Sequence, residues 1–252
     1  MKSLGRTIIS ASLALLITFL SSCQATGQIV ETGIEVMARN NFDLLQGKRV
    51  GLVTNPTGVD RNLRSTVDII NSAPGVKLTA LYGPEHGVRG EFPAGEYVES
   101  ETDHSTGLPV YSLYGKTRKP SPEMLNNIDI LVYDIQDIGS RSYTFISTLG
   151  LLMEAAAEKG IPVVVLDRPN PLGGIKMEGV VTRPGFFSFV SQFAIPYIHG
   201  MTVGELAMFL NGEGMLANGI RCDLHVVKMN GWSRKMMFEE TGLHWIPSSP
   251  HV

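Results

Sequence analysis

The sequence lacks the features of several large classes of protein. Only two of its 252 residues are cysteines, Cys23 and Cys222, and no metal-ligand spacing surrounds Cys222, which we expect to be a small buried side chain. With 21 basic and 24 acidic side chains the net charge is −3, which offers no basic footprint for a nucleic acid. Neither a G-x-G-x-x-G sequence after the first predicted strand nor a Walker A sequence occurs, so dinucleotide binding and phosphate-loop chemistry have no support. These absences favour a domain with a neutral or sugar-like partner.

No apolar run is long enough to cross a membrane comfortably. Residues 8–20 are apolar and follow Lys2 and Arg6, as in a secretory signal peptide. The sequence Leu-Ser-Ser-Cys that ends at Cys23 is typical of a lipoprotein signal, in which the cysteine is acylated and becomes the new N-terminus. We therefore expect a signal peptide in residues 1–22, a tether in residues 23–35, and an exported lipoprotein anchored to a membrane through Cys23, facing the periplasm or the cell surface. The alternative is an ordinary secretory peptide followed by an incidental cysteine.

Short apolar runs rich in β-branched residues predict four buried parallel strands, at residues 49–54, 78–82, 128–135 and 161–166. Helical patterns occupy residues 62–73 and 144–159, and the second ends before Gly160, a common residue after a helix. This alternation indicates an α/β fold with a Rossmann-like, mostly parallel sheet flanked by helices, which we expect to span residues 36–200 as the catalytic domain. A helix at 202–210, opened by capping-box spacing, and a strand at 220–226 predict the beginning of a second domain in residues 201–252.

Each predicted strand runs into a polar loop that contains glycine or proline. The carboxyl ends of parallel strands meet at one edge of a sheet, where ligands bind in this class of fold. We therefore expect a site there that unites residues far apart in the sequence, namely Asn55, Glu85, His86, Asp134, Gln136, Asp137, Arg141, Tyr143, Asp167, Arg168, Asn170 and His199. The segment 92–107 is expected to be a solvated loop, with a flap over the substrate as the alternative.

Carboxylates, arginines and amides on one edge suit the hydrolysis of a glycosidic bond. That reaction usually needs one carboxyl group that donates a proton to the leaving oxygen and a second that stays ionised. Glu85 lies between Pro84 and His86 after an apolar strand, where partial desolvation could raise its pKa, so it is the candidate acid. Asp134 and Asp137 are the candidates for the ionised partner, and Arg141 could hold one of them charged.

Each of these residues also has a structural interpretation. Asp167 and Arg168 could form an ion pair that braces their own loop, and Asp134 or Asp137 could cap the following helix. Glu85 could be a plain surface residue. His86 is expected to be structural or to contact substrate rather than to bind a metal, because no second histidine lies at ligand spacing.

Six ordered segments carry a resemblance to a known family. They are Gly-Leu-Val-Thr-Asn-Pro-Thr-Gly (51–58), Leu-Tyr-Gly-Pro-Glu-His-Gly-Val-Arg-Gly (81–90), Leu-Pro-Val-Tyr-Ser-Leu-Tyr-Gly (108–115), Tyr-Asp-Ile-Gln-Asp-Ile-Gly-Ser-Arg (133–141), Leu-Asp-Arg-Pro-Asn-Pro-Leu-Gly-Gly (166–174) and Tyr-Ile-His-Gly-Met-Thr-Val-Gly-Glu-Leu (197–206). Together they resemble the bacterial exo-β-N-acetylmuramidases of peptidoglycan recycling, formerly a family of unknown function. The resemblance extends from about Val36 to the end of the chain.

The resemblance implies a glycosidase that releases N-acetylmuramic acid from the non-reducing ends of peptidoglycan-derived muropeptides or MurNAc-GlcNAc saccharides, without a metal or organic cofactor. It also implies that the glutamate of the Gly-Pro-Glu-His-Gly motif, Glu85, is catalytic. An arginine fork is the natural reader of the lactyl carboxylate that distinguishes muramic acid from N-acetylglucosamine, so we expect Arg141 or Arg168 to set this preference. Family members continue past a segment like residues 245–252 into a domain that closes the cleft, so we expect this chain to be a truncated N-terminal part.

Two other classes of function stay open on the sequence alone. A lipoprotein that binds muropeptides or oligosaccharides without cleaving them would use the same edge of the sheet. Turnover of a chromogenic muramic acid glycoside would separate that binding protein from an enzyme. An amidase or esterase is disfavoured, because no G-x-S-x-G sequence occurs and no serine lies beside a histidine in the predicted site loops.

Overall fold

A seven-stranded sheet organises the part of the chain that the computed structural model describes, residues 29–93, 95 and 101–249. The strand order is β3-β4-β2-β1-β5-β6-β7, and every neighbouring pair is parallel except β3 with β4. The strands are β1 (Arg49–Thr54), β2 (Lys77–Gly83), β3 (Glu101–Thr102), β4 (Pro109–Ser112), β5 (Ile130–Asp134), β6 (Val163–Leu166) and β7 (Leu224–Val227). The chain builds outward from β1 through β2 and returns to β5 on the other side, so the order reverses between β1 and β5. The predicted α/β fold with a mostly parallel sheet is confirmed.

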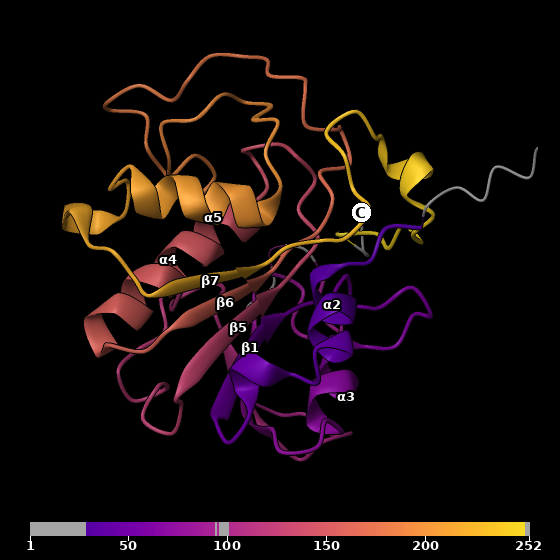
Figure 1. Cartoon of the computed structure of the whole chain (residues 1–252). Helices are drawn as coiled ribbons and strands as arrows, with labels where there is room; N and C mark the ends of the chain where they lie inside the picture. Colours follow the sequence, from indigo (N-terminus) through magenta and orange to yellow (C-terminus); the bar gives the residue numbers. More distant parts are fainter. Residues whose placement is uncertain (1–28, 94, 96–100, 250–252) are drawn as a thin grey trace, which may run out of the picture.

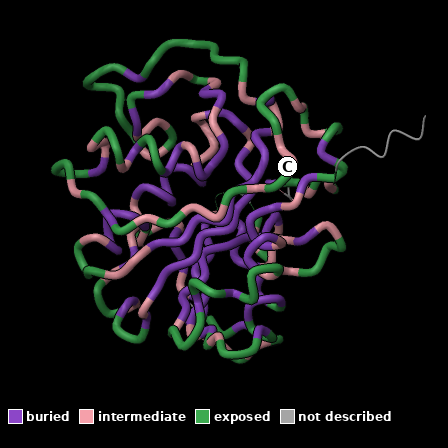
Figure 2. The backbone as a smooth tube through the Cα atoms, viewed as in Figure 1, coloured by how far each residue is buried: buried purple, intermediate pink, exposed green. Residues whose placement is uncertain are grey.

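Helices cover both faces of this sheet (Figure 1). The helices α2 (Gly33–Arg39) and α3 (Thr66–Asn71) lie on one face, and α4 (Phe145–Lys159) and α5 (Val203–Gly212) lie on the other. Short 3-10 turns occur at Asp43–Leu45, Ala217–Gly219 and Phe238–Thr241. One apolar core fills the space on each side of the sheet, and Figure 2 shows the buried strands running through the centre. Burial on both faces explains why the central strands carry apolar residues on both of their alternating faces.

The predicted elements match the observed ones closely, except that the helix predicted at 62–73 is shorter and the strand predicted at 220–226 begins only at Leu224. The capping threonine predicted for the helix at 202–210 accepts the backbone N–H of Glu205 at 3.2 Å. The helix predicted at 62–73 begins only at Thr66. The Asp60 carboxylate accepts the N–H groups of Asn62 and Arg64 at 2.9 and 2.8 Å, and this turn puts Leu63 in the left-handed region, so no helix can start there.

The folded domain begins earlier than the predicted tether allows. Val30 and Ile34 are fully buried, and α2 begins at Gly33 after Thr32, whose N–H donates to Glu35 at 2.8 Å. A Cβ at position 33 would lie 2.4 Å from the backbone nitrogen of Asp167, so only glycine lets α2 approach the end of β6 this closely. The predicted tether at 23–35 is therefore wrong for residues 29–35. Cys23 and the predicted signal peptide lie outside the described residues.

The helix and strand expected to open a second domain at residue 201 instead complete the first one. β7 pairs in parallel with β6, from Val163 with Leu224 to Leu166 with Val227, and α5 packs against α4 in the same apolar core. The free edge of β6 gives β7 a ladder of hydrogen-bonding groups, which a separate domain would leave unpaired. Within the described part of the chain, no helix combines the length and apolar character that crossing a bilayer requires.

Candidate active site

A cavity of about 570 Å³ lies among the loops after β2 and β4 and the start of α4, and this volume is in the range of small-molecule sites. Of the predicted site residues it brings together Glu85, His86 and Tyr143. Glu85 is the only carboxylate among its described lining residues. The lining consists of Glu85, His86, Tyr114, Arg118, Ser142, Tyr143, Thr144, Phe145, Ser188, Phe189, Val190, Ser248 and Ser249.

The register between β2 and β4 places Glu85 beside Tyr114. Gly83 pairs with Ser112, and two further residues along each chain lead to Glu85 and Tyr114, both half-buried. Burial, and after it the hydrogen bond to Glu85, raises the pKa of Tyr114, so the phenol stays protonated and donates a hydrogen bond to the carboxylate. The N–H of Gly95 also donates to Glu85 Oε1 at 3.1 Å. Two donors thus orient a carboxyl group that still faces the cavity.

His86 joins the loop after β2 to the C-terminal segment. Its backbone is in the left-handed region (φ 73°) and its side chain is buried. Ring Nδ1 lies 3.0 Å from the carbonyl oxygen of Phe92, so it carries the proton, and Nε2 lies 3.0 Å from Ser249 Oγ. Ser249 therefore reaches His86 from a segment that the predicted site loops did not include.

Asp134 is occupied by a buried ion pair. Arg168 Nε donates to Asp134 Oδ1 at 2.6 Å, and Nη2 donates to Oδ2 at 2.9 Å, while the Thr66 hydroxyl donates to the same Oδ2. Asp134 is completely buried and Arg168 nearly so. The expected pairing of Arg168 with Asp167 is wrong, because Arg168 reaches across to Asp134 at the end of the neighbouring strand. The expected pairing of Arg141 with one of the central aspartates is also wrong, because Arg141 donates to backbone carbonyls instead. Asp134 does not line the cavity that contains Glu85.

Asp137 belongs to an internal network with His199. Its Oδ2 accepts the N–H of Gly139 at 2.8 Å and lies 3.2 Å from His199 Nε2. The N–H of Met201 donates to His199 Nδ1 at 3.3 Å, so the proton of this ring sits on Nε2 and points to Asp137. Both side chains are buried, and Asp137 Oδ1 has no hydrogen-bond partner within the described part of the chain. Asp137 therefore stabilises a turn at Gly139 and orients His199, outside the Glu85 cavity.

Asp167 holds the start of α5 against the end of β6. Its Oδ1 accepts the N–H groups of Arg168 and Gly204 at 3.0 and 2.8 Å, and its Oδ2 accepts the Thr202 hydroxyl at 3.0 Å. Burial raises the pKa of Asp167 to about 6 in spite of these hydrogen bonds. A carboxylate at a helix N-terminus is a structural arrangement, since it satisfies amides that have no partner inside the helix.

Three predicted substrate-binding amides are buried inside the loops. Asn55 Oδ1 accepts the N–H and hydroxyl of Thr57 at 3.0 and 2.6 Å. Gln136 Nε2 donates to two loop carbonyls at 2.7 Å each, and Asn170 Nδ2 donates to a third carbonyl at 2.8 Å. All three are at most 5% exposed, so their side chains shape the edge of the sheet from within.

Arg141 fixes the long loop between β6 and α5. Its Nη1 donates to the carbonyl oxygens of Val180 and Ile195 at 2.7 and 2.5 Å, and its guanidinium carbon lies 5.7 Å from the ring centre of Tyr197. Both bonds use Nη1 of the guanidinium within the fold. Arg141 does not line the Glu85 cavity.

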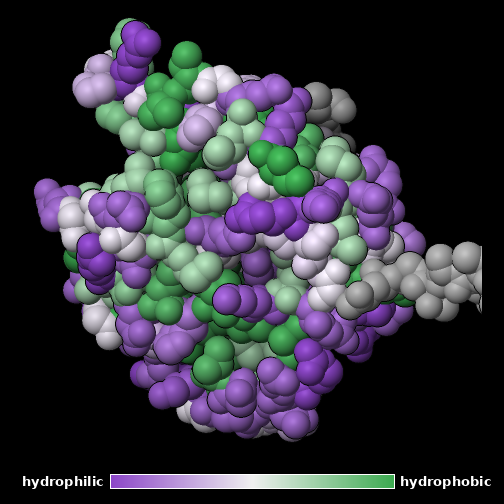
Figure 3. Space-filling view, turned by 45° about the horizontal axis from the view of Figure 1, so that its top comes forward, coloured by the Kyte–Doolittle hydropathy of each residue, from purple (hydrophilic) through white to green (hydrophobic). Residues whose placement is uncertain are grey.

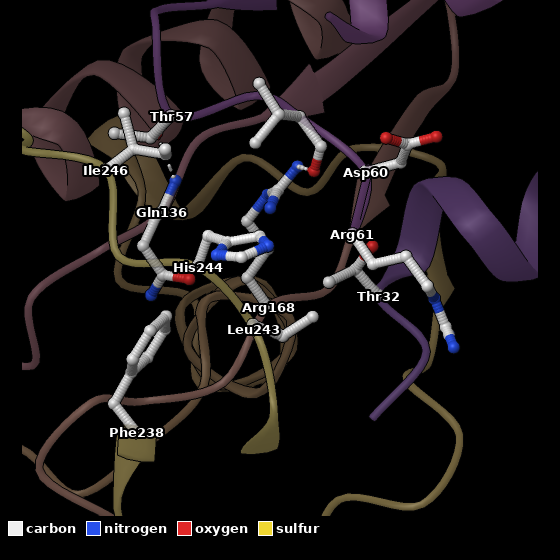
Figure 4. A pocket seen from close by; sticks show the side chains of 11 residues that line it. Thr32, Thr57, Asp60, Arg61, Gln136, Arg168, Phe238, Leu243, His244 and Ile246 are labelled. Atoms are coloured by element: carbon white, nitrogen blue, oxygen red, sulfur yellow. Dashed lines mark hydrogen bonds between the residues drawn. The ribbon is translucent and has the colours of Figure 1, made fainter. Parts of the chain in front are cut away.

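The crevice where the strand order reverses, the usual ligand site of such sheets, is nearly filled. The space left between the ends of β1 and β5 is about 20 Å³, which is room for roughly one water molecule. Figure 4 shows its lining, to which the C-terminal segment contributes Phe238, Leu243, His244 and Ile246. Because this segment occupies the crevice, the larger space at this edge of the described chain is the neighbouring cavity around Glu85.

The loop between β6 and α5 adds apolar surface beside the cavity. Figure 3 shows hydrophobic side chains gathered in the upper part of the view, where the top of Figure 1 comes forward. The exposed apolar residues of this loop are Ile175, Met177, Val180, Val181, Phe186, Phe187 and Val190. Phe189 and Val190 reach the cavity itself, so its lining combines apolar surface with the polar groups of Glu85, Tyr114 and Arg118. Within the described chain, no group of three or more histidine, cysteine, aspartate or glutamate side chains is arranged to hold a metal ion.

Tyr114, Arg118 and Ser249 line the cavity but were not predicted as site residues. Tyr114 could have been found, because a strand assigned to residues 109–112 would have placed it on the carboxyl edge beside Glu85. Arg118 and Ser249 lie in irregular segments, where no periodic pattern shows which side chains turn inward.

The comparisons with known proteins decide the family. A family model described as "Exo-beta-N-acetylmuramidase NamZ, N-terminal" matches residues 50–252. The chain belongs to this family. A Bacillus subtilis (strain 168) relative named peptidoglycan beta-N-acetylmuramidase NamZ is 54% identical over 223 residues, which are 88% of this chain and 53% of that protein.

Two crystal structures of DUF1343 family proteins from Bacteroides fragilis NCTC 9343 share the NamZ-family fold of this chain. The first is 65% identical with a TM-score of 0.83, and it covers 88% of this chain and 56% of that chain. The second is 35% identical with a TM-score of 0.73, and the match covers 83% of this chain and 54% of that chain. The chain therefore spans about half the length of the relatives that it matches.

Replacing Asp167 tests the structural role of this carboxylate. Burial raises its pKa from 3.8 to about 6, so the folded state favours the protonated form, and this contribution to stability is lost as the pH rises through about 6. Asn mimics the protonated group. The free energy of unfolding of Asp167→Asn relative to wild type should therefore rise by roughly 2–3 kcal/mol between about pH 4 and pH 7, measured by urea unfolding. Asp43→Asn, at an exposed carboxylate, is the control and should show no such trend; a flat difference for Asp167→Asn would contradict the assignment.

Proposed function

We propose that this chain carries the proton donor of an exo-β-N-acetylmuramidase, a glycoside hydrolase that releases terminal N-acetylmuramic acid from peptidoglycan fragments. The observation that carries the proposal is the position of Glu85, the one carboxyl group among the described residues of the 570 Å³ cavity. Membership of the NamZ family and the name of the Bacillus subtilis relative support the substrate class. The proposed substrates are muropeptides and MurNAc-GlcNAc saccharides.

In the proposed reaction Glu85 donates its proton to the glycosidic oxygen as the bond from that oxygen to C1 breaks. The ionised Glu85 then takes a proton from the water molecule that adds to C1, which restores the acid. Glycosidases usually supply a second carboxylate, but Asp134, Asp137 and Asp167 all lie outside this cavity. We propose that the acetamide oxygen of the substrate attacks C1 and is later displaced by water.

Tyr114 stabilises the negative charge that Glu85 acquires when it gives up its proton in this reaction. Its hydroxyl donates to the ionised form of Glu85, and its raised pKa keeps it protonated while it does so. When Glu85 is protonated, Tyr114 and the N–H of Gly95 still fix the direction of the carboxyl group. A positioned acid of this kind is the requirement for general acid catalysis.

Replacing Glu85 by Gln separates an enzyme from a protein that only binds muropeptides. Gln keeps the shape and the hydrogen bonds but cannot donate a proton as a carboxylic acid does. We expect turnover of a chromogenic muramic acid glycoside to fall about 10²- to 10⁴-fold, with sugar binding by calorimetry largely retained. Glu213→Gln, at an exposed glutamate after α5, is the matched control and should leave both quantities unchanged.

Three results would contradict this proposal. Near wild-type turnover in Glu85→Gln would exclude the assigned acid. Binding of muramic acid without turnover in the wild-type chain would favour the binding protein. Hydrolysis of a nitrophenyl ester that Ser249→Ala abolishes, without any glycoside turnover, would instead favour an esterase built on Ser249 and His86.

We also propose that the protein is exported and anchored to a membrane by acylation of Cys23, with residues 1–22 removed. The support is the sequence alone, a basic start, an apolar stretch and the Leu-Ser-Ser-Cys pattern. The full chain expressed in a bacterium should partition into detergent and incorporate labelled palmitate. Cys23→Ala should release it to the aqueous phase, and Cys222→Ala, at the buried cysteine, should not. Unchanged partitioning of Cys23→Ala would remove the claim.

A further inference from the structure

Recognition of muramic acid requires a cation that faces the substrate. The lactyl group gives this sugar a carboxylate that N-acetylglucosamine lacks, and a guanidinium is well suited to pair with it. The two arginines predicted for this task both make contacts within the fold. Arg168 makes a bidentate pair with Asp134, and Arg141 donates to two backbone carbonyls, while neither lines the Glu85 cavity.

Arg118 is placed differently from both. It lines the cavity together with Glu85, and it is the only lysine or arginine among the described lining residues. Its guanidinium carbon lies 4.3 Å from the ring centre of Phe189, another lining residue, and this cation–π contact holds the group without using its N–H donors. No described carboxylate lies within ion-pair distance of Arg118, so its donors are available to a ligand.

The surroundings of Arg118 also favour a negative group. Helix α4 begins at Phe145, and Thr144 and Phe145 line the same cavity, so the N-terminal end of a 15-residue helix adds a partial positive charge there. Arg118 lies close enough to Tyr114 to act on it electrostatically, and Tyr114 in turn is hydrogen-bonded to Glu85. The cavity thus contains a proton donor and a cation on neighbouring parts of its wall.

We propose that Arg118 is the specificity-determining residue that selects muramic acid by pairing with its lactyl carboxylate. The inference rests on the proposed function for the kind of sugar, but it concerns binding and does not require turnover. Arg118 replaces Arg141 and Arg168 as the reader of this group. Phe189 is a positioning residue, because it acts through the guanidinium.

The test compares a sugar acid with its neutral amide in the full chain. Calorimetry gives dissociation constants for N-acetylmuramic acid, for the amide of its lactyl group, and for N-acetylglucosamine. Wild type should bind the acid about 10- to 100-fold more tightly than the amide. Arg118→Gln should bring this ratio close to one, and Arg118→Lys, which keeps the charge but loses the fork, should give an intermediate ratio. Arg221→Gln, at an exposed arginine before β7, is the matched control and should keep the wild-type ratio.

A wild-type ratio in Arg118→Gln would overturn the inference, and so would a wild-type chain that binds the acid no better than the amide or binds none of these sugars. Arg118 is exposed, so its replacement should leave the melting temperature unchanged, which circular dichroism checks. A wild-type chain with the expected ratio but no glycoside turnover would support the role of Arg118 and contradict the proposed hydrolase.

Discussion

The buried ion pair between Asp134 and Arg168 is the constraint on which the carboxyl edge of the sheet depends. It joins the ends of the adjacent strands β5 and β6, and the Thr66 hydroxyl and the carbonyl of Val59 tie α3 and the loop after β1 to the same pair. A bidentate pair with further hydrogen bonds can offset the cost of removing two charges from water. Loss of one partner would leave an unpaired buried charge, which typically costs about 3–5 kcal/mol. Two residues with the chemical character of a catalytic site are therefore used to hold the edge together.

This arrangement also explains where the substrate can bind. Asp167 holds the start of α5 and Asp137 holds a turn and His199, so the acidic residues around the centre of the sheet are committed to structure. The C-terminal segment fills the crevice between β1 and β5, leaving space for about one water. The open cavity lies one strand further along, beside the end of β2, where Glu85, Tyr114 and Arg118 meet. The open cavity thus lies away from the point where the strand order reverses.

The sequence predicts the fold better than the site, for a physical reason. Apolar strands such as residues 49–54 reveal themselves by composition, and parallel topology says which edge their following loops occupy. Topology does not say which polar side chains turn inward. Asp134 ends one buried strand and Glu85 follows another, yet Arg168 pairs with Asp134 inside the protein while Glu85 lines a cavity. Arg118 and Ser249 reach the cavity from irregular segments, and only the folded chain brings them there.

A structure of the Glu85→Gln chain bound to a chromogenic muramic acid glycoside would test the account most directly. The account predicts that the sugar lies in the Glu85 cavity, with the glycosidic oxygen within about 2.6–3.2 Å of the side chain at position 85 and the lactyl carboxylate on Arg118. It also predicts no contact between the sugar and Asp134, Asp137 or Asp167. A sugar seated in the crevice between β1 and β5, or one whose glycosidic oxygen faces Asp137, would contradict it.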